Sequence, residues 1–88
     1  MKQEIIDKVE KIIIENSPIG EEVRNNTKDK EFRECSLINE LSYDSLSFIR
    51  MISDVEEELD IIFDDEILLS STTFTVSTIL DAVDKLLA

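Results

Sequence analysis

The sequence contains no histidine and only one cysteine, Cys35. Without histidine there is no Ser-His or Cys-His pair to activate a nucleophile, and no cysteine–histidine cluster to hold zinc. Cys35 has no partner for an intramolecular disulfide, whereas small secreted domains usually carry several. These absences predict a non-catalytic, metal-free protein of the reducing cytoplasm, in which Cys35 is a half-buried thiol in a loop.

Glycine and proline occur once each, as Gly20 and Pro18. An all-β fold with many tight turns needs more of both residue types, so helices are favoured. No apolar run is long enough for a signal peptide or a membrane-spanning helix, which predicts no membrane insertion. The 88 residues suit one small core, and residues 1–88 are therefore expected to form a single, monomeric domain.

Basic residues are scarce, since 21 acidic residues stand against 9 basic ones and the net charge is −12. Beyond residue 36 the only basic residues are Arg50 and Lys85. Such a charge repels nucleic acid and anionic membranes, and it attracts proteins that carry basic patches. The plainer interpretation is that the acidic surface only keeps the chain soluble.

Apolar residues recur at steps of three and four in three long stretches, which is typical of helices with one buried face. These stretches are Lys2 to Asn16, Asp44 to Asp60 and Thr75 to Leu87. A short third helix is expected from Asp64 to about Ser70, and a helical turn near residues 30–35 of the long loop 17–43. The expected fold is all-α, a four-helix bundle with three long helices, one short third helix and a long first loop.

The segment 41–46, Leu-Ser-Tyr-Asp-Ser-Leu, is the most informative part of the chain. Asp44 is a good N-cap, because its carboxylate can accept hydrogen bonds from the free amides of the first helical turn. Ser45 then presents its hydroxyl at the positive end of the helix dipole, where an attached phosphodiester gains favourable electrostatics. Taken alone, the pair is also consistent with an ordinary start of a helix.

The segment resembles the attachment site of acyl carrier proteins, whose usual form is leucine-glycine-x-aspartate-serine-leucine. Neighbouring segments are similar to that family as well: 37–41, 55–61, 63–66 and 75–84. The resemblance covers about residues 36–87 closely and the first helix loosely. It implies a four-helix carrier on which Ser45 bears a covalent 4'-phosphopantetheine arm, with Asp44 and Leu46 flanking the site.

The resemblance also implies the partners. A phosphopantetheinyl transferase would attach the arm, and acyl-loading and acyl-processing enzymes with basic patches would then dock on the second helix. Apart from Asp44 and Leu46, the residues expected to contact partners are Arg50, Asp54, Glu56 and Glu57. The bundle is further expected to shelter an acyl chain, although the same side chains could simply form the core: Ile49, Ile52, Ile62, Phe63 and Val83.

Three positions depart from the family pattern. Ser47 and Arg50 stand where fatty-acid carriers usually have acids, and Ser42 replaces the usual glycine. The second helix therefore looks closer to free-standing carriers of polyketide or nonribosomal peptide pathways. The expected function is an acyl carrier for fatty acid, polyketide or related biosynthesis. The alternatives are an aminoacyl or peptidyl carrier of a nonribosomal peptide pathway, and an acidic helical protein-interaction module.

Overall fold

The computed structural model describes residues 2–23, 31–64 and 74–87. The described helices are α1 (Gln3–Glu15), the 3₁₀ helices η1 (Gly20–Glu22) and η2 (Phe32–Glu34), α3 (Ser45–Leu59) and α5 (Val76–Leu87). These residues contain no strand, and one isolated antiparallel bridge joins Ser36 to Thr75. The all-helical class is thus confirmed, and the turn expected near residues 30–35 is η2. The short third helix expected at 64–70 lies almost wholly outside the described residues.

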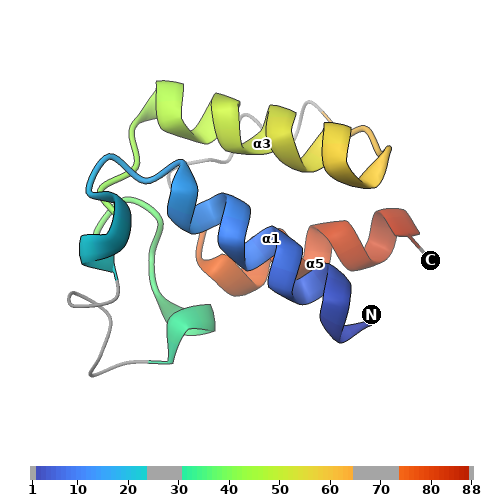
Figure 1. Cartoon of the computed structure of the whole chain (residues 1–88), viewed down its shortest axis with the longest axis horizontal. Coiled ribbons are helices and arrows are strands. Elements are labelled where there is room, and N and C mark those ends of the chain that lie inside the picture. Colours follow the sequence, from blue (N-terminus) through green and yellow to red (C-terminus); the bar gives the residue numbers. More distant parts are fainter. Residues whose placement is uncertain (1, 24–30, 65–73, 88) are drawn as a thin grey trace.

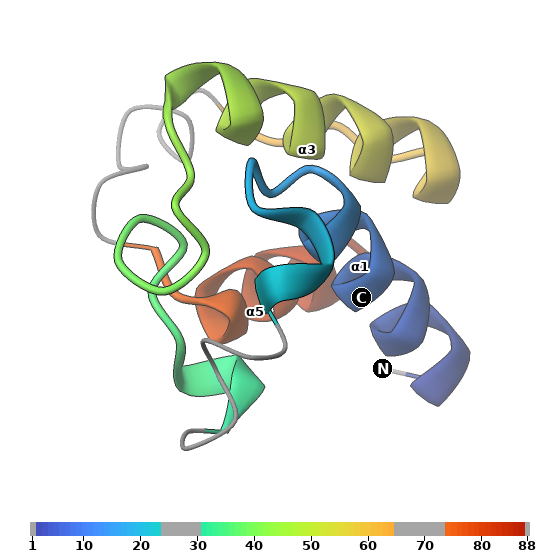
Figure 2. The ribbon, with the colours of Figure 1, turned by 60° about the vertical axis from the view of Figure 1, so that its left-hand side comes forward.

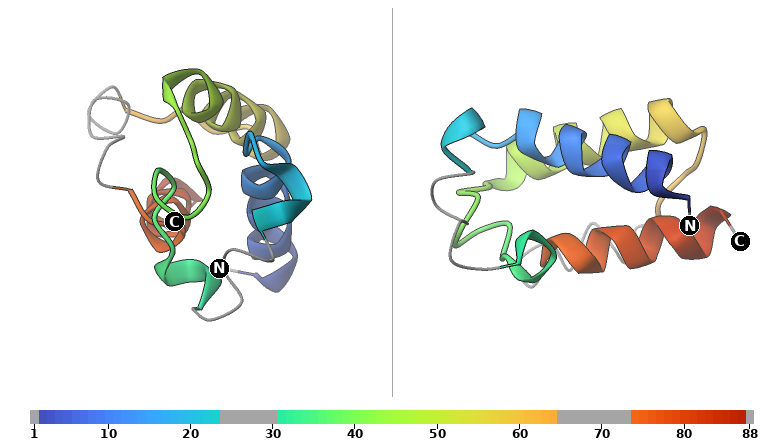
Figure 3. Two further views of the ribbon diagram at one scale, coloured as in Figure 1. Left: turned by 90° about the vertical axis from the view of Figure 1, so that its left-hand side faces the viewer. Right: turned by 60° about the horizontal axis from the view of Figure 1, so that its bottom comes forward.

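The three α-helices surround one interior (Figure 3). Helix α1 runs in the opposite direction to α3 and α5, so the two termini lie at the same end of the molecule (Figure 1). At the other end, the segment that leads into α3 runs from beside the start of α5 to the start of α3 (Figure 2). The start of α3 therefore lies at the end of the molecule that is remote from the termini.

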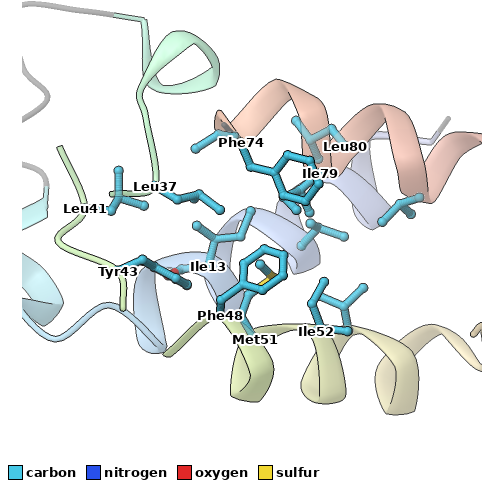
Figure 4. Close-up of a cluster of buried hydrophobic side chains, with 14 of the residues drawn as sticks. Ile13, Leu37, Leu41, Tyr43, Phe48, Met51, Ile52, Phe74, Ile79 and Leu80 are labelled. Carbon is cyan, nitrogen blue, oxygen red and sulfur yellow. The ribbon is translucent and has the colours of Figure 1, made fainter. Parts of the chain in front are cut away.

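The core is formed by the apolar faces of the three helices together with side chains of the connecting segments (Figure 4). The rings of Phe48 on α3 and Phe74 before α5 pack with their centroids 5.5 Å apart. Cys35 is 0% exposed, and its thiol donates to the carbonyl of Glu31 at 3.5 Å. The expectation of a half-buried Cys35 is therefore wrong, because the bridge at Ser36 draws this part of the loop into the core.

Two buried hydroxyl groups fasten the segment before α3 to the end of α1. The Tyr43 hydroxyl donates to the carbonyl of Ile13, and the Ser17 hydroxyl donates to the carbonyl of Leu41 at 2.6 Å. On the opposite side, the Leu37 amide donates to the carbonyl of Phe74 at 3.0 Å. The approach to α3 is thus held between α1 and the residues before α5, and neither hydroxyl contact was anticipated from the sequence.

Replacement of Tyr43 by phenylalanine tests this attachment. Tyr43→Phe keeps the buried ring but leaves the carbonyl of Ile13 without this donor, which should cost about 1–2 kcal/mol of unfolding free energy. Burial, and secondly the charge of Asp54, raise the pKa of Tyr43 above its ordinary value of 10.0. Because the folded state holds the phenolic proton more tightly, wild-type stability should fall as the pH rises above 10.0.

The measurement is urea unfolding of both proteins at neutral pH and at several values above pH 10.0. Tyr43→Phe should be less stable at neutral pH and should lose less stability on alkalinisation. Equal stability of the two proteins at neutral pH would show that the hydroxyl contact contributes nothing.

Candidate attachment site at the start of α3

Asp44 determines where α3 begins. Its backbone is extended, with φ −115° and ψ −177°, and its Oδ1 accepts a hydrogen bond from the Ser47 amide at 2.8 Å. Its carbonyl accepts the Phe48 amide at 3.0 Å, the first hydrogen bond of the helix. The Ser47 amide, and then the Ser47 hydroxyl, hold the pKa of the Asp44 carboxyl below its usual value of 3.8. The N-cap predicted from the sequence is confirmed.

The lowered pKa of Asp44 predicts a specific pH dependence. Because the unfolded carboxyl binds its proton at higher pH, the cap stabilises the fold above about pH 3.8, and this contribution is lost as the pH falls through the folded-state pKa. Asp44→Asn retains a capping oxygen without the charge, so its melting temperature should depend less on pH in acid. Asp44→Ala should melt lower at neutral pH as well.

Thermal unfolding of the three proteins from neutral pH to well below pH 3.8 provides the measurement, because the loss occurs below the usual pKa of the carboxyl. If Asp44→Asn loses as much stability in acid as the wild-type protein does, the carboxylate does not cause the acid sensitivity.

Ser42 carries the main backbone strain of the approach to the site. Its φ of 59° lies in the left-handed region, which costs a residue with a Cβ about 1–2 kcal/mol. The carrier pattern has glycine at this position, and glycine adopts this conformation without a penalty. The sequence showed the departure from the pattern, and the structure shows that the backbone conformation typical of glycine is kept.

Replacement of Ser42 by glycine should therefore stabilise the protein, by about 0.5–1 kcal/mol after the entropy of the unfolded glycine is included. Ser42→Ala is the matched control, because it removes the hydroxyl and keeps the Cβ. Chemical denaturation of both variants measures the effect. A gain in Ser42→Ala equal to that in Ser42→Gly would assign the effect to the hydroxyl and not to the backbone.

Ser45 is the first residue of α3, and its side chain is exposed. Its hydroxyl makes no hydrogen bond with the described part of the chain. Because Ser45 is the first helical residue, its hydroxyl lies near the amides of the first turn, at the positive end of the helix dipole. Ser47, two residues further on, is only 8% exposed, and its amide is held by Asp44. Leu46 lies next to Ser45 and is 55% exposed.

The acids expected to contact partners are not equally available. The Asp54 Oδ2 accepts the side-chain amide of Asn16 at 2.9 Å, which ties α3 to the end of α1. The Glu56 Oε2 accepts the Phe63 amide at 2.9 Å and so holds the chain that leaves α3. Arg50 and Glu57 are exposed, and neither forms an ion pair within residues 2–23, 31–64 and 74–87.

The residues expected to line an acyl cavity fall into two groups. Ile52, Phe63 and Val83 are buried in the core. Ile49 is 55% exposed and Ile62 is 80% exposed. Ile49 and Ile62 therefore do not belong to an interior lining, because Ile49 lies on the outer face of α3 and Ile62 follows the turn that ends this helix. Helical periodicity alone groups Ile49 with the buried residues of α3, whereas the structure exposes it.

None of the helices within the described segments combines the length and the apolar character needed to cross a membrane. Among the same residues, no group of three or more acidic, cysteine or histidine side chains is arranged to hold a metal ion.

Comparison with known proteins identifies the family. The chain is 41% identical over 64 residues to a protein named acyl carrier protein from Karelsulcia muelleri (strain GWSS). The match covers 73% of this chain and 69% of that relative. No family model and no solved structure matches the chain. Identity at this level over most of both proteins places the chain among small carrier proteins. It belongs to the acyl carrier protein family.

Proposed function

We propose that the protein carries acyl groups as thioesters on a 4'-phosphopantetheine arm attached to Ser45. Family membership supports a carrier role, and the exposed Ser45 hydroxyl at the start of α3 is the observation that carries the assignment. The residues fit the group, because the hydroxyl is open to solvent and the carboxylate of the preceding residue, Asp44, accepts a hydrogen bond from the Ser47 amide. When attached, the arm would supply a terminal thiol.

The chain's own part in the attachment is limited to presenting a nucleophile. The Ser45 oxygen would bond to the phosphorus of coenzyme A that bears the pantetheine group, the pyrophosphate bond to the nucleotide would break, and adenosine 3',5'-bisphosphate would leave. The serine proton would pass to a base of the phosphopantetheinyl transferase. Since this enzyme would supply the base, the absence of histidine from the carrier is no obstacle. We propose no catalytic residue in this chain.

The same proposal extends to the organisation of the protein. Residues 1–88 are proposed to form one cytoplasmic, monomeric carrier domain, in which a short helix near residues 64–70 completes a four-helix bundle. Its partners are proposed to be the transferase and acyl-loading and acyl-processing enzymes with basic patches. The acyl cargo is proposed to belong to fatty acid, polyketide or related biosynthesis.

A second candidate function is an aminoacyl or peptidyl carrier. It is favoured by Ser47 and Arg50, which stand at the two positions of α3 where fatty-acid carriers usually have acids. The two functions are separated by offering the arm-bearing protein to acyl ligases and, in parallel, to amino-acid-adenylating enzymes. Intact mass of the products shows which class of cargo is accepted.

Replacement of Ser45 by alanine tests the attachment site. Incubation with coenzyme A, magnesium and a broad-specificity phosphopantetheinyl transferase should add the mass of one arm to the wild-type protein and none to Ser45→Ala. The variant should fold normally, because alanine is a good helix former and the replaced side chain is exposed. Ser53→Ala is the matched control, since Ser53 is an exposed serine of the same helix and should not affect loading.

Two outcomes would contradict the proposal. An arm on Ser45→Ala protein would place the attachment elsewhere. A folded wild-type protein that gains no arm in this incubation would favour the remaining alternative, an acidic helical protein-interaction module. Circular dichroism of every variant distinguishes loss of the site from loss of the fold.

A further inference from the structure

The outer face of α3 carries an unusual sequence of chemical groups. Its buried face is formed by Phe48, Met51, Ile52 and Val55. The exposed residues on the opposite side, at helical spacing from Ser45 onward, are Leu46, Ile49, Arg50, Ser53 and Glu57. Along this face an apolar pair comes first, then a cation, then an anion.

Contacts within the chain determine which charges remain available on this face. Asp54, four residues after Arg50, is at a suitable spacing for an ion pair with it, yet Asp54 accepts the amide of Asn16. Glu58 lies 3.5 Å from the Lys8 ammonium. With Glu56 on the Phe63 amide, Arg50 and Glu57 remain as the outward charges that no described residue pairs.

The acidic end of α3 is also unfavourable for the helix itself. Glu56, Glu57 and Glu58 lie in its last turn, which contains no basic residue, where the helix dipole is negative. Glu56 and Glu58 are offset by their contacts within the chain. Glu57 has no such contact among the described residues, so the stability of the helix does not account for its position.

We propose that α3 docks on partner enzymes whose surface alternates in charge, and does not dock on a uniformly basic one. This inference rests on the proposed carrier function. The complementary surface has an apolar depression for Leu46 and Ile49 beside the opening through which the arm enters. It has an acidic side chain opposite Arg50 and a basic side chain opposite Glu57, about 10 Å further along the helix axis.

The test uses protein that already bears the arm, with the arm verified by intact mass. The probe is an acyl-loading enzyme with a uniformly basic docking surface, together with its variant in which the basic residue nearest the arm's opening is replaced by glutamate. Arg50→Glu should raise kcat/KM on the basic probe by about fivefold or more, because a repulsion becomes an attraction. On the glutamate variant of the probe, the wild-type carrier should be the better substrate.

Lys85→Glu is the matched control, since it makes the same change in net charge at an exposed position on α5. Lys85→Glu should leave kcat/KM on the basic probe and on its glutamate variant close to the wild-type values. A similar gain from Lys85→Glu and Arg50→Glu, or no reversal between the two probes, would overturn the docking inference. Neither result would affect the carrier function, which fails only if the transferase cannot attach the arm.

A second readout examines the acidic end of the face. Glu57→Lys should raise the melting temperature, because a cation replaces an anion at the negative end of the helix. Glu57→Lys should also lower kcat/KM on the glutamate variant of the probe, because on that variant Arg50 already has an acidic partner and the loss at Glu57 can be measured separately. A rise in melting temperature with unchanged kcat/KM would exclude Glu57 from the docking surface and so overturn this part of the proposal.

Discussion

The hydrogen bond from the Ser47 amide to the Asp44 carboxylate is the interaction on which the candidate site depends. It ends the extended approach and starts α3 at Ser45, which leaves the Ser45 hydroxyl exposed at the helix terminus. A helix that started one turn earlier or later would place this hydroxyl within the helix body or in the preceding loop. The cap also engages the carboxylate of Asp44, the residue that precedes Ser45.

The cap can act only because the backbone before it is held in place. Tyr43 and Ser17 attach the approach segment to the end of α1, and the amide of Leu37 attaches it to the carbonyl of Phe74. Ser42 tolerates a left-handed conformation within this framework. The strain at Ser42 is compatible with folding because buried contacts on both sides determine the path of the chain. The site is therefore a product of tertiary contacts as much as of the helix start.

The helices and the attachment serine could be predicted from sequence because their signals are local. Apolar spacing located α1, α3 and α5 to within one residue at each end, and Asp44 marked the cap. What could not be predicted depends on contacts between distant residues. The bridge from Ser36 to Thr75 buries Cys35, and the Asn16 amide occupies Asp54. Nothing in the periodicity of either helix shows such a pairing.

The same distinction explains the errors made for the apolar residues. Ile49 and Ile52 both follow the helical period of α3, yet the structure exposes the first and buries the second. A stripe wide enough to include both is a reasonable inference from sequence, because the edge of a buried face depends on how closely its neighbours approach. Here Ile52 belongs to the buried core, whereas Ile49 lies outside it.

For a protein that would pass its cargo between enzymes, the separation of roles along α3 has a physical consequence. A charged side chain that makes a contact within the fold must lose that contact before it can pair with a partner, which lowers the net gain from docking. In this chain Asp54, Glu56 and Glu58 have internal contacts, while Arg50 and Glu57 do not, among the described residues. The proposed docking through the latter two charges would leave the cap at Asp44 and the packing of α3 undisturbed.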